Sequence, residues 1–348
     1  MVDTKQLALE EKDYIVSERR HFHEHPELGR HEVETTKHIV SELQKMGIEV
    51  ITFPDITGCI GVIHGKYPGK TVALRADIDA LPIQEANLTK SYCSQNPGVM
   101  HACGHDCHTA MLLGAAKILS SHREEIHGTV KLLFQMAEEI GTESRHYVEN
   151  GSLSDVDAIF GMHIWATLDA GTANFEDGPR MACSDRFTIK IHGKSAHGSA
   201  PDQGKDAVVA AAAVVMGLQT LVSRENNPQN TFVLTVGMMN GGTQSNIIAD
   251  SVELVGTTRT FNKPFRNHLP DMIKEAATQI ASGYGCSAEC TYFFGPAPLI
   301  NEHQYLNDIA RQAVAEVMGK EALVPMDKQM GAEDFAVYME SIPGVFGF

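Results

Sequence analysis

Short apolar segments that alternate with helical segments constrain the fold of this chain more than any other feature of its sequence. Helical patterns cover residues 5–46 and 108–120, and strand-like runs cover residues 58–63, 71–75, 129–136 and 157–163. Apolar runs of this length between helices are typical of a sheet that is covered by helices on both faces. We therefore predict an α/β fold with a mixed, largely parallel sheet flanked by helices.

The pattern changes after about residue 183. The segments that follow are an alternating strand at 186–191, an Ala/Val-rich helix at 206–222, strands at 231–236 and 251–258, and a polar helix at 268–280. The order strand, helix, strand, strand, helix, strand predicts a compact α+β sandwich. Because a helix resumes at 305–318, we interpret residues 181–294 as a domain inserted into a discontinuous catalytic domain of residues 1–180 and 295–348. The length of 348 residues also favours two domains.

Composition and charge exclude several classes of partner. The chain carries 44 acidic and 28 basic side chains, and its formal net charge of −16 opposes binding to nucleic-acid phosphates or anionic membranes. Seven cysteines, an odd number, do not indicate a disulfide framework in a chain this long. We find no secretion signal and no apolar run near the roughly 20 residues that span a bilayer. We therefore expect a cytoplasmic protein with neither nucleic-acid nor membrane partners.

Polar side chains follow three of the predicted strands at the point where each strand ends. Asp77 and Asp79 follow the strand at 71–75, Glu138 and Glu139 follow the next, and His163 ends the third. Ligand sites of α/β sheets lie beyond the carboxyl ends of the strands. The sequence therefore predicts a metal or catalytic centre at this edge of the sheet.

The segment MHACGHDCHTA, residues 100–110, is the strongest local signal. It places six polar side chains just before a helix, namely His101, Cys103, His105, Asp106, Cys107 and His108. Thiolate, imidazole and carboxylate donors together suit zinc or a similar divalent ion. The alternatives are a polar first turn with a chance histidine content, or an oxidation-sensitive free thiol. Asp77 and Asp106 can equally cap a turn or a helix.

Several motifs in the same order make the chain resemble a known family. The stretches are RRHFHEHPELG, LRADIDALP, MHACGHDCHTA, FQMAEE, GMHIW, SNIIADSVELVGTTRTF and GAEDF. Together they look like the aminoacylase, hippurate hydrolase and auxin-conjugate hydrolase group of metallopeptidases, from about residue 15 to the last residue. The resemblance implies a phosphorylase/hydrolase-like catalytic domain with an inserted ferredoxin-like domain.

The resemblance also implies roles for individual residues. Cys103, His105, Glu139 and His163 would bind two divalent ions, with zinc or manganese expected first and cobalt or nickel also accepted. Glu138 would be the general base that takes a proton from water and passes it to the leaving amine.

Residues outside the ligand set also receive roles from the resemblance. Asp79 would orient a ligand or the base. His197 would reach the substrate carbonyl oxygen from a partner subunit, which implies a homodimer formed by the inserted domain, and Asn246 and Arg259 would grip the substrate carboxylate. His101 and His108 remain open between an outer position around the metals and no role.

The sequence departs from the family pattern at three places. Cys107 stands where relatives usually have glycine, and Met136 stands where they usually have proline. Relatives also continue beyond the position of Phe348 and supply a further histidine ligand from that tail. Because residues 344–346 read as a strand cut in mid-run, we expect that the protein continues past this sequence.

The function that these observations favour is hydrolysis of N-acyl amino acids to a carboxylic acid and a free amino acid. A metallocarboxypeptidase or dipeptidase is an alternative, because it also breaks an amide bond beside a carboxylate. A non-catalytic metal-binding or small-molecule-binding homologue is a second alternative. A nucleotide-binding oxidoreductase is disfavoured, because no strand is followed by a Gly-x-Gly-x-x-Gly motif.

Overall fold

The computed structural model describes residues 3–348, and these form two compact units. Of the described residues, unit 1 comprises 3–180, Asn301–Asp327 and Asp334–Phe348. Unit 2 comprises Met181–Ile300 and Lys328–Glu333. The chain thus leaves unit 1 twice and returns to it twice, so that the short segment before Asp334 belongs with unit 2.

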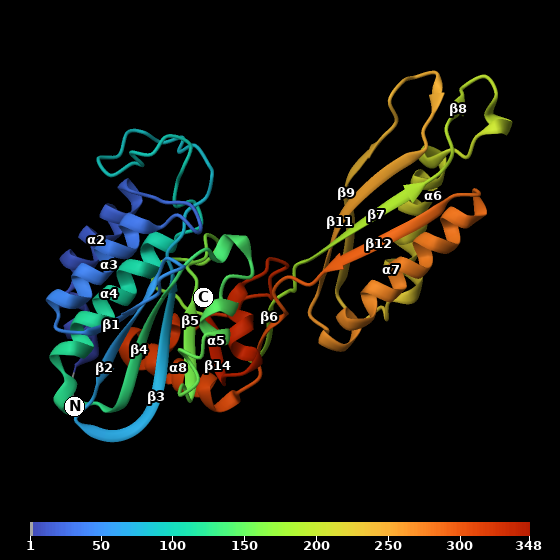
Figure 1. The fold of residues 1–348 in the computed structure, drawn as a ribbon. Helices are drawn as coiled ribbons and strands as arrows, with labels where there is room; N and C mark the ends of the chain where they lie inside the picture. The colour runs from blue at the N-terminus through green and yellow to red at the C-terminus, as the bar shows by residue number, and fades with distance from the viewer. Residues whose placement is uncertain (1–2) are drawn as a thin grey trace. The chain divides into compact units, whose positions relative to one another are not determined.

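Unit 1 is built on a six-stranded sheet in the order β1-β2-β4-β3-β5-β14 (Figure 1). The strands are β1 (Glu49–Thr52), β2 (Cys59–His64), β3 (Tyr67–Asp77), β4 (His127–Gln135), β5 (Ala158–Met162) and β14 (Gly344–Gly347). The β3–β4, β3–β5 and β5–β14 pairs are parallel, and the β1–β2 and β2–β4 pairs are antiparallel. The predicted mixed, largely parallel sheet is therefore confirmed, and β14 pairs with β5 over its whole length.

Helices pack against this sheet through apolar side chains. Those of unit 1 are α1 (Thr4–Glu10), α2 (Lys12–Glu24), α3 (Val33–Lys45), α4 (His105–Ser121), α5 (Arg145–Glu149) and α8 (Gln304–Met318). Phe22, Leu43 and Leu113 from α2, α3 and α4 share one buried cluster with Phe134 of β4. Ala310 of α8 packs near Val345 of β14 in another cluster. The predicted helical pattern over residues 5–46 corresponds to α1, α2 and α3, and the helix predicted at 305–318 corresponds to α8.

Unit 2 has a four-stranded antiparallel sheet in the order β12-β7-β11-β9. Its elements are β7 (Asp185–His192), α6 (Ala207–Thr220), β9 (Phe232–Gly241), β11 (Ser251–Thr260), α7 (Lys263–Gly283) and β12 (Ser287–Phe293). Figure 1 shows α6 and α7 together beside this sheet, and their buried side chains share one cluster with those of β7, β9 and β11. The order strand, helix, strand, strand, helix, strand matches the prediction.

One helix corrects an expectation about apolar runs. The continuous helix Ala207–Glu225 has the length and a mean hydropathy of 1.6 that would suffice to cross a membrane, whereas we expected no such run. Its buried side chains, among them Ala211, Val214 and Leu218, pack in the core of unit 2. A helix rich in Ala and Val that packs on a small sheet can therefore be as apolar as a membrane-spanning helix.

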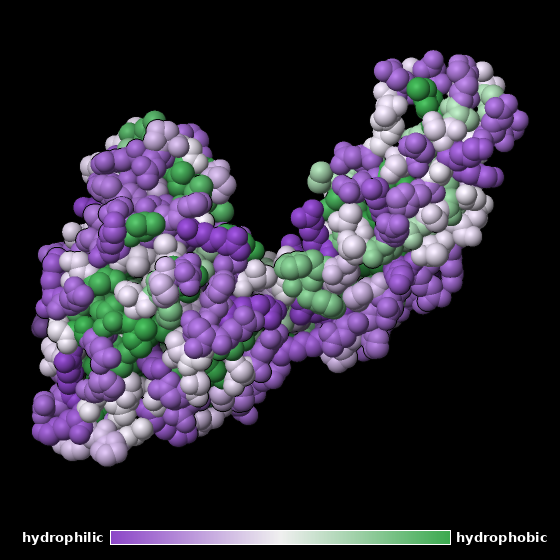
Figure 2. All heavy atoms as spheres, viewed as in Figure 1, coloured by the Kyte–Doolittle hydropathy of each residue, from purple (hydrophilic) through white to green (hydrophobic). Residues whose placement is uncertain are grey.

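Figure 2 shows hydrophilic residues over most of the visible face of each unit.

Candidate metal centre

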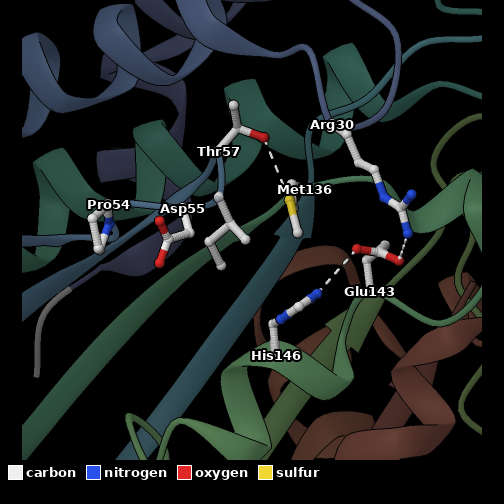
Figure 3. A pocket seen from close by; sticks show the side chains of 8 residues that line it. Arg30, Pro54, Asp55, Thr57, Met136, Glu143 and His146 are labelled. Atoms are coloured by element: carbon white, nitrogen blue, oxygen red, sulfur yellow. Dashed lines mark hydrogen bonds and ion pairs between the residues drawn. The ribbon is translucent and has the colours of Figure 1, made fainter.

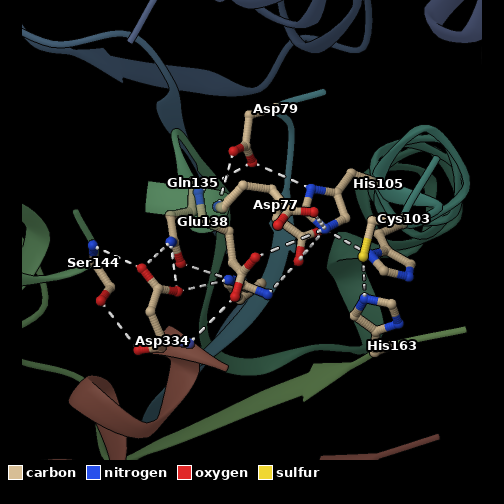
Figure 4. A network of polar contacts seen from close by, with 12 residues as sticks. Asp77, Asp79, Cys103, His105, Gln135, Glu138, Ser144, His163 and Asp334 are labelled. Atoms are coloured by element: carbon tan, nitrogen blue, oxygen red, sulfur yellow. Dashed lines mark hydrogen bonds and ion pairs between the residues drawn. The ribbon is translucent and has the colours of Figure 1, made fainter. Parts of the chain in front are cut away.

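The carboxyl ends of three neighbouring strands lie at one edge of the unit 1 sheet, because β3 pairs in parallel with both β4 and β5. β3 ends at Asp77, a short 3-10 helix (Glu138–Ile140) follows β4, and His163 follows β5. His105, the first residue of α4, and Cys103, two residues before it, add their side chains to the same edge (Figure 4). The site thus receives side chains from four separate segments of the chain.

The other three predicted ligands lie around the imidazole of His105. Potential ligand atoms of Cys103, His105 and His163 lie within 4.8 Å of one another, and so do those of His105, Glu138 and Glu139. The Cys103 Sγ is 3.3 Å from His163 Nε2. His105 Nε2 is 3.9 Å from Glu139 Oε1 and 4.0 Å from Glu138 Oε2. His105 therefore belongs to both groups of potential ligands, which lie on either side of its ring nitrogen Nε2.

Two turns with unusual backbone angles place these donors. Gly104 has φ +97°, and a Cβ there would lie 2.4 Å from the side chain of Ile164, so a glycine is required between Cys103 and His105. Ala137 has φ +53°, a left-handed conformation that costs a non-glycine residue free energy. It turns the chain directly after β4, which brings the next two residues back toward the end of β3.

Asp79 holds both sides of the centre in place. Its Oδ1 and Oδ2 accept hydrogen bonds of 3.0 Å from the backbone N–H groups of Glu138 and Glu139, respectively. Its Oδ1 also lies 3.2 Å from His105 Nδ1. An N–H at Nδ1 that donates to Asp79 leaves Nε2 of His105 as the atom that can bind a cation. This is the geometry that the predicted orienting role of Asp79 requires.

His108 forms a further group with Asp77 and His105, whose potential ligand atoms also lie within 4.8 Å of one another, but both of its ring nitrogens contact other protein atoms. Its Nδ1 is 2.6 Å from Asp77 Oδ1, and its Nε2 accepts a hydrogen bond of 2.9 Å from the backbone N–H of Ile164. Both ring nitrogens are thus in use, and His108 links Asp77 to the residue after His163. The nitrogen Nδ1 of His163 is itself hydrogen bonded to the carbonyl of Ile164, so its Nε2 faces Cys103.

Asp106 and His101 lie next to the centre without joining the donor groups. Asp106 Oδ2 is 2.8 Å from His23 Nδ1 and 2.9 Å from Arg19 Nε, so this carboxylate ties α4 to α2. His101 is buried, and neither of its ring nitrogens has a hydrogen-bond partner among residues 3–348. Burial lowers the pKa of His101 to about 4, which keeps its ring neutral.

The electrostatics around His105 favour a bound cation. Burial opposes a positive charge on this ring, but the carboxylates of Asp77 and Asp79 outweigh burial and raise the pKa of His105 well above its usual value. Its Nε2 is buried without a hydrogen-bond partner in the described chain. An unpartnered buried nitrogen among carboxylates is a position that a metal ion would satisfy.

The other donors titrate as buried ligands do. Burial, assisted by His108, lowers the pKa of His163 to about 3, so its ring is neutral and free to bind a metal. Burial raises the pKa of both the Cys103 thiol and the Glu139 carboxyl. A divalent ion would reverse this effect, because it favours thiolate and carboxylate. One thiolate, two imidazoles and a carboxylate therefore fit divalent ions of the zinc type.

Three further predicted residues lie in unit 2. His197 is in β8 (Ala196–His197), which pairs with β10 (Ile247–Ile248), and its Nδ1 is 2.7 Å from Ser199 Oγ. Asn246 directly precedes β10, and its carbonyl accepts a hydrogen bond of 2.7 Å from Gly198 N–H. The structure thus brings His197 and Asn246 together. Arg259 lies in β11, and its Nη1 is buried without a hydrogen-bond partner among residues 3–348.

A separate cavity of about 570 Å³ opens beside the turn that follows β4 (Figure 3). Arg30, Thr57, Met136, Glu143 and His146 are among its lining residues, and none of the predicted ligands is. Met136, which departs from the family pattern, thus contributes to this cavity instead of the donor group. The cavity is a neighbour of the metal centre and is not the space into which the ligands point.

The sequence interpretation missed Glu32, whose carboxylate holds the backbone of the turn at Ala137. Its Oε1 accepts a hydrogen bond of 2.7 Å from Ala137 N–H, and its Oε2 accepts one of 2.6 Å from Thr57 Oγ1. The side chain is fully buried, and burial raises the pKa of Glu32 to about 7 in spite of these donors. No local pattern signals this role, because Glu32 reads as a charged residue at the start of a surface helix.

Replacement of Glu32 should change how stability depends on pH. A carboxyl whose pKa is raised on folding binds more protons in the folded state, so the free energy of unfolding falls as pH rises from about 4.5 to about 7. We expect Glu32→Gln to remove this loss, with a gain of about 2–3 kcal/mol at pH 8 that shrinks below pH 5. Thermal unfolding midpoints between pH 5 and 8.5 measure the effect. Glu34→Gln, at an exposed position two residues away, is the control; parallel curves for the Glu32 variant and the unchanged chain would contradict the expectation.

Thiolate, imidazole and carboxylate donors at the carboxyl edge of a mixed sheet define a metal-dependent hydrolase site. Residues 73–348 match Peptidase family M20/M25/M40, and the chain belongs to this family. The chain is 43% identical over 334 residues to "N-acetylcysteine deacetylase" of Bacillus subtilis. The matched residues make up 95% of this chain and 87% of that protein. It is 42% identical over 344 residues to "IAA-amino acid hydrolase ILR1-like 4" of Arabidopsis thaliana, and the matched residues make up 97% of this chain and 77% of that protein.

Solved structures give the same result. The Bacillus subtilis YXEP protein, described as a dinuclear metal-binding peptidase of the M20 family, superimposes with a TM-score of 0.85 and is 40% identical, over 99% of this chain and 88% of that one. A putative aminohydrolase from methicillin-resistant Staphylococcus aureus gives a TM-score of 0.92 at 34% identity, over 99% and 91%. The resemblance inferred from the sequence motifs is confirmed.

Proposed function

We propose that this chain hydrolyses N-acyl amino acids to a carboxylic acid and a free amino acid. The observation that carries the proposal is the pair of donor groups around His105 Nε2, with Glu138 beside Glu139 at the same edge. Relatives whose names specify deacetylation of N-acetylcysteine or hydrolysis of IAA-amino acids support the substrate class. All of these substrates share an acyl–amide bond next to a free carboxylate.

The proposed metal ligands are Cys103, His105, Glu139 and His163. Two divalent ions, when bound, would polarise the scissile carbonyl and lower the pKa of water. Zinc or manganese is proposed first, and cobalt or nickel suits the same donor types. The side chains do the positioning: the hydrogen bonds of Asp79 hold the ring of His105 and the backbone of Glu139 in one arrangement.

Glu138 is the proposed general base. Its carboxylate is buried at the edge of the donor group, 4.0 Å from His105 Nε2, and its backbone is fixed by Asp79. In this position it takes a proton from the attacking water and delivers it to the nitrogen of the leaving amine. The chemistry requires a carboxylate that does not bind metal itself, which is why Glu138 and its neighbour Glu139 have different proposed roles.

Unit 2 is proposed to supply contacts to the substrate and the interface of a homodimer. The homodimer is proposed to be cytoplasmic. His197 stabilises the negative charge on the carbonyl oxygen, while Asn246 and Arg259 bind the substrate carboxylate. The unpartnered, buried Nη1 of Arg259 supports this assignment, because such a donor needs an acceptor from outside the described residues.

A substrate panel tests the proposal. We expect turnover of N-acetyl and N-benzoyl amino acids to exceed that of unblocked dipeptides, because the acyl portion of a dipeptide carries a charged amine next to the scissile carbonyl. Preference for dipeptides would identify a metallocarboxypeptidase or dipeptidase instead. A protein that binds metal and hydrolyses neither class would be the non-catalytic homologue. Each ion is tested separately, with bound metal measured in the same samples.

Mixing of two inactive variants tests whether His197 acts from the partner subunit. A heterodimer of Glu138→Ala and His197→Ala chains contains one site with both changes and one site with neither. If His197 acts across the interface, mixing should restore up to about half of the activity per dimer. If it acts within its own chain, each site keeps one defect and mixing restores nothing.

A further inference from the structure

Arg75 lies fully buried beneath the metal centre, between two carboxylates. Its Nη1 donates to Asp77 Oδ2 at 2.6 Å, and its Nη2 donates to Asp334 Oδ1 at 3.0 Å. All three side chains are inaccessible to solvent. Buried charges are retained only when they are paired and hydrogen bonded, so this arrangement must hold each carboxylate in a defined orientation.

The carboxylate of Asp77 leads from Arg75 to the proposed metal ligands. Asp77 Oδ1 is 2.6 Å from His108 Nδ1, and Asp77 Oδ2 is 3.7 Å from His105 Nε2. His108 in turn accepts a hydrogen bond from the backbone of Ile164, next to His163. A change at Asp77 therefore acts on His105 directly and on the segment of His163 through His108.

The carboxylate of Asp334 leads from Arg75 to the proposed general base instead. It accepts hydrogen bonds of 2.8 and 2.9 Å from Gln135 Nε2 and one of 3.1 Å from Ser144 N–H (Figure 4). With this carboxylate held, the backbone N–H of Asp334 points at Glu138 Oε1 at 3.4 Å. Figure 4 shows Asp334 and Gln135 on the side of Glu138, away from Cys103 and His163.

Gln135 ties the two carboxylates into one network. Its Oε1 accepts a hydrogen bond of 2.8 Å from Arg75 Nε and one of 2.9 Å from Tyr338 Oη. The guanidinium therefore uses three nitrogens on three different partners. A planar group with several donors can do this, whereas a lysine ammonium cannot reproduce the geometry.

We propose that Arg75 is a positioning residue with two separable arms. The Asp77 arm sets the affinity for metal, and the Asp334 arm holds Glu138 in position for proton transfer. The second statement rests on the proposed role of Glu138 as the general base. Arg75 holds the carboxylates of Asp77 and Asp334, and Asp334 in turn presents its backbone N–H to Glu138.

Two isosteric variants of the full-length protein test the separation. Asp77→Asn should weaken binding of Zn²⁺ about 10–100-fold, the usual cost of losing a partner behind a metal ligand. Asp334→Asn should leave Zn²⁺ affinity and KM within about twofold and lower kcat about 10–100-fold. The amide introduced by Asp334→Asn would turn a donor toward Gln135 or Ser144, so the N–H that faces Glu138 would shift.

Competition with a chelator of known affinity measures metal binding, and steady-state kinetics separates kcat from KM. Equal losses of metal affinity in both variants would overturn the proposal, and so would an Asp334→Asn variant with unchanged kcat. If Asp334→Asn fails to fold, Ser144→Ala removes the hydrogen bond of 3.0 Å from Ser144 Oγ to the Asp334 carbonyl and must give the same pattern. Arg75→Lys should lower both the Zn²⁺ affinity and kcat. A decrease in only one of the two would contradict the proposal that Arg75 holds both carboxylates.

The same experiment distinguishes this proposal from the proposed function. If the unchanged protein hydrolyses no N-acyl amino acid, the proposed substrate class is wrong, and kcat is then measured on the dipeptides of the panel. The contrast in Zn²⁺ affinity between Asp77→Asn and Asp334→Asn needs no substrate at all. Loss of that contrast overturns the two-arm arrangement whatever the enzyme hydrolyses.

Discussion

The Glu138→Ala variant is expected to bind metal as the unchanged chain does and to hydrolyse N-acyl amino acids about 10²–10⁴-fold more slowly, the usual contribution of a general base. The carboxylate lies at the edge of the donor group, and its contacts with His105 and with the backbone of Asp334 do not require it as a ligand. Without it, the proton of the attacking water and the proton needed by the leaving amine have no carrier. Initial rates and metal content of the same preparation measure both expectations.

Glu138→Gln is the matched control for shape. The amide keeps the volume and the possible hydrogen bond from Asp334 N–H, but it cannot accept the proton of water, so it should be nearly as slow as the alanine variant. Glu149→Ala, at the end of the nearby α5, should leave kcat unchanged. Activity like that of the unchanged chain would remove Glu138 from the mechanism, and loss of metal together with activity would make Glu138 a ligand.

Most of the fold follows from local patterns, and the differences have identifiable causes. The helix expected from residue 108 begins at His105, because Gly104 adopts a left-handed conformation and starts the helix earlier. The helix expected at 268–280 extends over Lys263–Gly283, where Asn262 caps its start through a hydrogen bond to Phe265 N–H. Both extensions lie at helix ends, where one capping residue decides the boundary.

The position of the site could be predicted because Asp79, Glu139 and His163 follow strands whose carboxyl ends lie at one edge of the sheet. The roles of these residues as ligands or as an orienting group came from the resemblance to the family. The residues behind them could not be found in this way. Arg75 and Asp334 are separated by 259 positions, and a pattern in the sequence does not reveal that two charged residues so far apart are buried together.

The Cys103→Ala variant is expected to lose metal, in contrast to Glu138→Ala. Partners that lie behind a ligand cost about 10–100-fold in affinity when removed, so loss of the proposed thiolate itself should cost at least that much, and activity should fall with occupancy. Cys103 Sγ lies 3.3 Å from His163 Nε2 and within the group that contains His105. Metal content after dialysis against a weak chelator measures the loss.

Cys107→Ala is the control, because it removes a thiol four positions away that belongs to none of the donor groups found among residues 3–348. Burial raises the pKa of Cys107 to about 11, so this thiol stays protonated at neutral pH and offers no thiolate to a metal. Its removal should leave both metal content and kcat close to those of the unchanged chain. Retention of metal by Cys103→Ala, or an equal loss in both variants, would show that the Cys103 thiol is not what holds the ions, and the imidazoles and carboxylates around it would then have to bind them without a thiolate.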